Sequence, residues 1–237
     1  MAMTHGAALI VHIVIGGIAF AAYWAALGSR KGSPLHRGAG KICLAVLIFV
    51  ILSVGPILFS RPGPFDPGFV VQMVYLTVCI GTVSMLAYTA IRFKREPERF
   101  RGRWFRILGP VMLLLGGVVL IAGLAKPDPV ALTLSWVGLA FGTGMIAFAR
   151  YRAPLHPRWW LGWHLNAVSA LFNAVHGTVL YVLFRWAGLV PDGATVQAAF
   201  QVLTVVAALA MRVWFGQKYG APLGFGPGRA MLRPGPS

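Results

Sequence analysis

Acidic residues are scarce in this 237-residue chain, which has five Asp and Glu against 21 Lys and Arg and a formal net charge of +16. Charged residues of both signs make up only 11% of the sequence, whereas a typical soluble domain carries about 25%. Hydrophobic residues reach 58%, and the mean hydropathy is +0.75. So few charges cannot cover a surface in water, so the sequence predicts a protein that faces lipid.

Cysteine is also rare, and the motifs of several enzyme classes are missing. Cys43 and Cys79 lie in separate apolar runs without C-x-x-C spacing, which predicts no disulfide framework and no redox or zinc motif of that type. The sequence has no H-E-x-x-H motif, no nucleophile motif with a His and an acid, and no phosphate-binding loop. The basic residues fall in short connections between apolar runs, which argues against nucleic acid as a partner.

Apolar runs of about 20 residues can cross the hydrocarbon core of a bilayer as helices. The sequence holds seven such runs, at 7–27, 42–59, 68–91, 107–125, 129–149, 160–184 and 194–215. The predicted fold class is therefore all-α, a polytopic transmembrane helix bundle over residues 1–215. Residues 216–237 are rich in Gly and Pro, which predicts a disordered cytoplasmic tail.

The positions of Lys and Arg predict how the spans are oriented. All but three of the 21 basic residues lie in alternate connections or toward the C-terminal end; the exceptions are Arg61, Lys126 and Arg185. Short loops with an excess of Lys and Arg stay on the cytoplasmic side. The sequence thus predicts a multi-pass protein of the bacterial cytoplasmic (inner) membrane, with its N-terminus outside and its C-terminus in the cytoplasm.

Histidine is the one ionisable residue type that enters the predicted spans away from their ends, and such residues mark function in membranes. Depth estimates place His12 and His176 toward the outer side, and His164 toward the inner side near His36 and His156. Two imidazoles at each face would suit a b-type cytochrome. His164 and His176 point about 120° apart around their helix, which favours a single site. Imidazole also suits copper or zinc.

The order of motifs resembles a bacterial membrane-protein family, domain of unknown function 2306. The resemblance is carried by His12 in a Gly-rich first span, by His36-Arg37-Gly38-Ala39-Gly40-Lys41, and by Trp160-Leu-Gly-Trp163-His164-Leu165. It covers about a third of the chain and departs at Ala167–Leu171, where the family has Met and Ser-Tyr. It implies that His12, His36, Arg37, Gly40 and His164 are family-type positions, and it implies no activity.

Three functions follow from these patterns. The leading hypothesis is an electron-transfer protein that binds haem b through His12, His36, His164 and His176, with Arg37 holding a propionate or lipid phosphate and with a quinone or a membrane redox subunit as partner. A second is a small-solute transporter with a 3+1+3 arrangement, lined by Gln72, Asn166, Asn173 and Gln201. A third is a non-catalytic assembly subunit that binds no cofactor.

Overall fold

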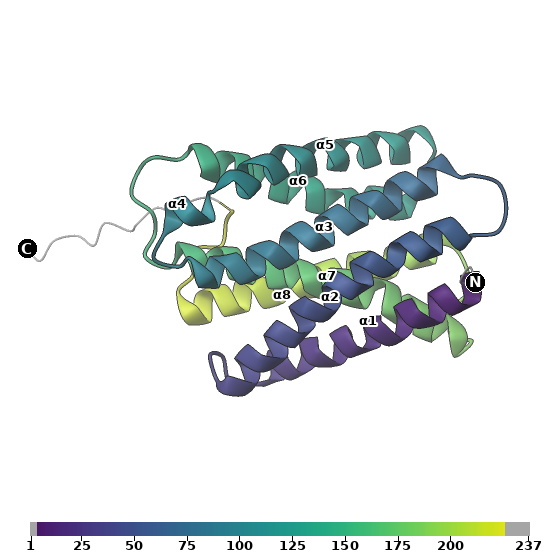
Figure 1. The fold of residues 1–237 in the computed structure, drawn as a ribbon, viewed down its shortest axis with the longest axis horizontal. Helices are drawn as coiled ribbons and strands as arrows, with labels where there is room; N and C mark the ends of the chain where they lie inside the picture. Colours follow the sequence, from purple (N-terminus) through teal and green to yellow (C-terminus); the bar gives the residue numbers. More distant parts are fainter. Residues whose placement is uncertain (1–3, 226–237) are drawn as a thin grey trace, which may run out of the picture.

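The computed structural model describes residues 4–225, and these form eight helices. The helices are α1 (His5–Gly28), α2 (Pro34–Ser60), α3 (Pro67–Arg92), α4 (Pro97–Phe100), α5 (Arg103–Ala125), α6 (Pro129–Arg150), α7 (Trp159–Trp186) and α8 (Ala194–Tyr219). The long helices run up and down roughly the same axis, and the short helix α4 lies at one end of the bundle (Figure 1).

Seven of these helices are long and apolar enough to cross a membrane, and each of the seven predicted spans lies within one of them. The prediction of an all-helical fold with seven helices able to span a membrane is therefore confirmed. The sequence did not predict α4, a single turn inside the basic connection between α3 and α5. Phe100 of α4 is buried and packs against Phe105 and Trp159 at centroid distances of 5.0 and 5.1 Å.

Local sequence explains where several helices begin. Ser33, Asp66 and Asp128 each accept a backbone N–H from the first turn of the following helix, and each is followed at once by Pro. This is the usual start signal, because Pro has no N–H to leave unpaired and the cap satisfies the next ones. The N–H of Phe69 is the main reason that the pKa of the Asp66 carboxyl lies below its usual range. Two of the five acids therefore serve as helix caps.

The helices form hairpins around a centre made by α3 and α7. The pairs α1–α2, α5–α6 and α7–α8 pack closely, and α3 packs on α7. In Figure 1 the α5–α6 hairpin lies along one edge and the α1–α2 hairpin along the opposite edge. The α1–α2 hairpin meets the rest mainly through α3, and α1 touches α7 over a short stretch. It is thus the most loosely attached part of the bundle.

Glycine lets α5 and α6 approach closely. A Cβ on Gly138 would lie 2.6 Å from the Met112 carbonyl oxygen and 2.8 Å from the Gly116 Cα, and a Cβ on Gly142 would lie 2.5 Å from the Leu113 nitrogen. The Tyr75 hydroxyl of α3 enters the same seam and accepts the Gly138 N–H at 2.9 Å. The small-xxx-small pattern of Gly138 and Gly142 is therefore where the two backbones meet.

The chain does not leave the bundle at residue 215. Helix α8 continues to Tyr219 and ends at Gly220, whose φ of 58° is the left-handed cap conformation that glycine adopts easily. Residues 221–225, called the strap here, then fold back onto α6, α7 and α8. Phe225 packs on Phe141 and Trp163 at 4.6 and 5.7 Å. The rest of the predicted tail, 226–237, lies outside the described residues.

Candidate functional site

The end of the bundle formed by 29–33, 93–102, 151–158 and the strap carries most of the basic residues and is called the basic end here. His36 lies there, on the first turn of α2, because Ser33 caps that helix by accepting the His36 N–H. The His36 Nδ1 donates to the Ala26 carbonyl oxygen of α1 at 2.8 Å. A carbonyl oxygen only accepts, so Nδ1 carries the proton, and in the neutral imidazole the lone pair is on Nε2.

His164 lies at the same end, near the start of α7. Its Nδ1 donates to the Ala87 carbonyl oxygen of α3 at 2.9 Å, so its Nε2 also keeps the lone pair when the ring is neutral. His36 and Lys31 are close enough to His164 to act on it electrostatically. Two histidines from helices far apart in sequence therefore lie at the same end of the bundle, His36 bonded to α1 and His164 bonded to α3, and both are half-buried.

Basic side chains surround this histidine pair. Lys31 donates to the Ala26 carbonyl oxygen at 3.2 Å, the same oxygen that His36 uses. Burial and the nearby Lys218 lower the pKa of Lys31. A groove of about 490 Å³ opens beside Lys31, between the end of α1 and the end of α8. Arg37 follows His36 on α2, is exposed, and its guanidinium makes no hydrogen bond or ion pair within residues 4–225.

His12 lies toward the opposite end and joins α1 to α2. Its Nδ1 is 2.7 Å from the Ser53 hydroxyl, which itself donates to the Val50 carbonyl oxygen at 2.7 Å. Because the serine proton is already used, the hydroxyl accepts from His12. His12 therefore shares the Nδ1-protonated form of His36 and His164, although its hydrogen bond has a structural role between neighbouring helices.

The structure does not bring His12 and His176 together as an axial pair. The His176 ring stacks on Phe172 at 3.9 Å and lies 4.9 Å from Phe20 and 5.5 Å from Trp24. Phe20 is eight residues beyond His12, which is about 12 Å along a helix. The depth estimate failed because it counted residues from helix ends, whereas α7 is shifted along its axis relative to α1.

An aromatic enclosure around His176 was not predicted. Tyr23 completes it at 5.7 Å, and its hydroxyl donates to the Val168 carbonyl oxygen at 2.9 Å. His176 Nδ1 donates to the Phe172 carbonyl oxygen at 2.8 Å, while the buried Nε2 has no partner within residues 4–225. Four rings around one imidazole leave no room for a macrocycle. Tyr23 is itself buried.

Two of the four polar residues expected to line a pore, Asn173 and Gln201, bond to each other instead. The Asn173 amide donates to the Gln201 side-chain oxygen at 3.2 Å and to the Thr204 hydroxyl at 2.8 Å. Gln201 in turn donates to Thr178 at 3.2 Å. Such bonds join transmembrane helices, so this cluster holds α7 to α8. Gln72 is half-buried on α3.

Asn166 has a different partner at the basic end. Its side-chain oxygen accepts from the Arg212 Nε, and the Arg212 Nη2 donates to the Pro222 carbonyl oxygen of the strap. Arg212 is 5% exposed, and its Nη1 has no partner within the described part of the chain. The charge pattern of the sequence places Arg212 among the basic residues near the end of the last span. That position gives no sign that the chain folds back over its side chain.

Among residues 4–225, no three His, Cys, Asp or Glu side chains come together as ligands for a metal ion. A scan against protein-family models and searches of curated proteins and of solved structures find no match. The site must be interpreted from its own geometry.

Proposed function

We propose that this is an electron-transfer protein of the bacterial cytoplasmic membrane that binds one haem b at its basic end, with His36 and His164 as axial ligands. The observation that carries the proposal is that two half-buried imidazoles lie at the same end of the bundle, each with its Nδ1–H fixed on a backbone carbonyl. Haem-ligating and metal-ligating histidines usually donate the other ring N–H in this way, which orients the ring and leaves Nε2 for the metal.

The surroundings of His36 and His164 fit a haem better than the surroundings of His12 and His176 do. Both rings are half-buried, so a flat ligand can approach along the loosely packed face of the α1–α2 hairpin. Arg37, Lys31 and Lys218 supply cations for propionates, and a guanidinium suits a carboxylate well. When bound, the haem would supply a one-electron redox centre. His12 and His176 were also predicted ligands, and we propose no haem between them because they lie far apart.

We also propose how the protein is oriented in the membrane and to which family it is related. The basic end is assigned to the cytoplasm by the excess of Lys and Arg in its loops, and a quinone or a membrane redox subunit is the expected electron partner. A distant relationship to the family of domain of unknown function 2306 is proposed on His12, His36, Arg37, Gly40 and His164.

Orientation is tested with reporter fusions. A cytoplasm-dependent fluorescent protein at the C-terminus is expected to be bright, and alkaline phosphatase inserted at Gly63 is expected to be active, because that connection lies at the opposite end. Phosphatase inserted at Gly32 serves as the control and should be inactive. The reverse pattern would mean that the basic end faces outward.

Haem binding is tested by an optical spectrum of the detergent-purified protein, oxidised and then reduced with dithionite. We expect a Soret band and sharp reduced α and β bands. His36→Ala and His164→Ala should lose them, because each removes one axial nitrogen. His12→Ala and His156→Ala are the matched controls and should keep them.

A colourless protein that was expressed with haem available and elutes as a single folded species would contradict the haem proposal. Equal loss in all four variants would point to a general folding defect. Retention in His164→Ala would remove the proposed pair. In the first case, solute-dependent thermal shifts would test transport, and co-purifying subunits would test a role in assembly.

A further inference from the structure

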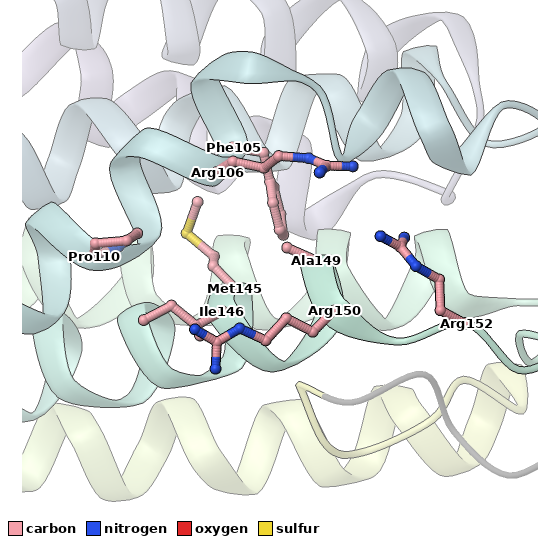
Figure 2. A pocket seen from close by; sticks show the side chains of 8 residues that line it. All are labelled: Phe105, Arg106, Pro110, Met145, Ile146, Ala149, Arg150 and Arg152. Atoms are coloured by element: carbon pink, nitrogen blue, oxygen red, sulfur yellow. The ribbon is translucent and has the colours of Figure 1, made fainter.

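A pocket of about 260 Å³ lies between the first turns of α5 and the last turns of α6, at the basic end. Its apolar lining includes Phe105, Met145 and Ile146. Figure 2 shows these side chains between the two helices, with arginines extending around them. The pocket is separate from the histidine pair, because it lies on the α5–α6 hairpin at the opposite edge of the bundle from α1–α2 (Figure 1).

Three arginines give the pocket a positive rim: Arg106, Arg150 and Arg152. The side chains of Arg150 and Arg152 make no hydrogen bond or ion pair within residues 4–225. Arg106 donates to the Arg101 carbonyl oxygen at 2.9 Å and lies 4.0 Å from the Glu98 carboxylate. Glu98 also pairs with Arg101, so the Arg101 and Arg106 guanidinium groups share one carboxylate. The rim therefore carries excess positive charge without a protein partner.

Pro110 gives the same pocket a hydrogen-bond acceptor. A proline in a helix has no N–H for the carbonyl four residues earlier, and that carbonyl belongs to Arg106. Pro110 lines the pocket, so the freed acceptor lies beside the cationic rim. A ligand that carries both an anion and a hydroxyl donor would use both features.

The position of the pocket at the end of an exposed apolar helix face indicates a lipid as its ligand. Farther along α5, Leu114, Val118 and Ile121 are exposed, as expected for a helix that faces hydrocarbon. The pocket lies at the charged end of that face, which is the depth of the lipid headgroups if the basic end marks the membrane boundary. This step rests on the proposed membrane orientation and is independent of haem.

We propose that this pocket binds the headgroup of an anionic, hydroxyl-bearing phospholipid of the phosphatidylglycerol type. The phosphate lies among Arg106, Arg150 and Arg152, which can make charge-assisted hydrogen bonds to its oxygens. The glycerol hydroxyl donates to the Arg106 carbonyl oxygen. The acyl ester region covers the half-buried Ile146 and Ala149, and the acyl chains follow the exposed face of α5.

The test is native mass spectrometry of the full-length protein in detergent with added palmitoyl-oleoyl phosphatidylglycerol or palmitoyl-oleoyl phosphatidylcholine. We expect phosphatidylglycerol to be retained at lower concentration. The double variant Arg150→Gln/Arg152→Gln should weaken its apparent affinity by roughly 25-fold, because each basic residue near an anionic lipid contributes about 1 kcal/mol, or about fivefold. Ala149→Trp, which fills the pocket without changing charge, should also weaken binding.

The matched control is Arg92→Gln/Arg95→Gln, which removes the same charge from the exposed end of α3 at the basic end. It should leave phosphatidylglycerol binding within about twofold, since surface charges away from the pocket act weakly. Equal weakening in both double variants would show general surface attraction and overturn the proposal. So would equal retention of phosphatidylcholine, normal binding in Ala149→Trp, or displacement of the lipid by soluble glycerol phosphate. The haem spectrum should be unchanged in these variants, so the two proposals fail separately.

Discussion

Gly142→Leu is expected to lower the free energy of unfolding by about 3–5 kcal/mol, the largest effect that we predict for a single substitution. A Cβ at this position would meet the backbone of Leu113, with 2.5 Å to its nitrogen and 2.8 Å to its Cα. A helix backbone cannot rotate away as a side chain can. Helices α5 and α6 would have to separate, and the Tyr75 hydroxyl in the same seam would lose its hydrogen bond from the Gly138 N–H. Titration of the detergent-purified protein with dodecyl sulfate, followed by circular dichroism, measures the change.

Gly117→Leu is the matched control, since a Cβ on Gly117 meets nothing within 4 Å. It adds the same side chain to α5 and should change the stability by less than about 1 kcal/mol, because Leu is the better helix former. Similar losses in both variants would mean that the cost comes from Leu in any transmembrane glycine position. The α5–α6 contact would then not be the cause.

Gly144→Leu is expected to release the strap and to raise the labelling rate of a cysteine placed at Ala221 by at least about tenfold. A side chain at Gly144 would occupy the space of the Phe225 ring, because its Cβ would lie 2.8 Å from the Phe225 Cγ. Phe225 anchors the strap against Phe141, and burying an aromatic side chain contributes about 2–3 kcal/mol. The measurement is the rate of maleimide labelling of Ala221→Cys with and without Gly144→Leu.

The native cysteines give a low background in this experiment, because Cys43 and Cys79 are both buried. Gly162→Leu should act like Gly144→Leu, since its side chain would meet the Pro222 ring and carbonyl of the strap at 2.9 and 3.0 Å. Gly117→Leu should leave the labelling rate unchanged. Fast labelling of Ala221→Cys in the otherwise unchanged protein would show that the strap is already open in detergent.

The spans could be predicted closely from the sequence, because the bilayer imposes a length and a polarity that each segment must meet alone. Capping residues followed by proline also act locally, and Asp128 marks the start of α6 at the predicted residue. Helix α2 begins at Pro34, ahead of the predicted span at 42–59, because Ser33 caps a polar first turn that apolar length alone does not count. The short helix α4 was missed because one turn has no periodicity. Its position depends on Phe100 packing against residues from α5 and α7, which only the folded bundle brings together.

The histidine site could be predicted only in part. The shared depth of His36 and His164 followed from the sequence, since both lie near the start of a helix at the basic end, and their pairing stays a prediction. The proposed partnership of His12 and His176 did not form, because the relative shift of two helices depends on how all their neighbours pack. The enclosure of His176 by Phe20, Tyr23 and Trp24 likewise has no pattern in the sequence, where aromatic residues near span ends usually indicate an interface.

The sequence alone determined that this chain has seven helices able to span a membrane, since apolar length is a property of each segment by itself. It also identified the residue types available for chemistry: histidines without intramembrane acids. Tertiary structure decided which of those residues meet, that Asn173 and Gln201 join helices, and that the strap covers Arg212. These contacts join segments far apart in the chain, and helix packing depends on the shapes of whole surfaces, which no local pattern encodes.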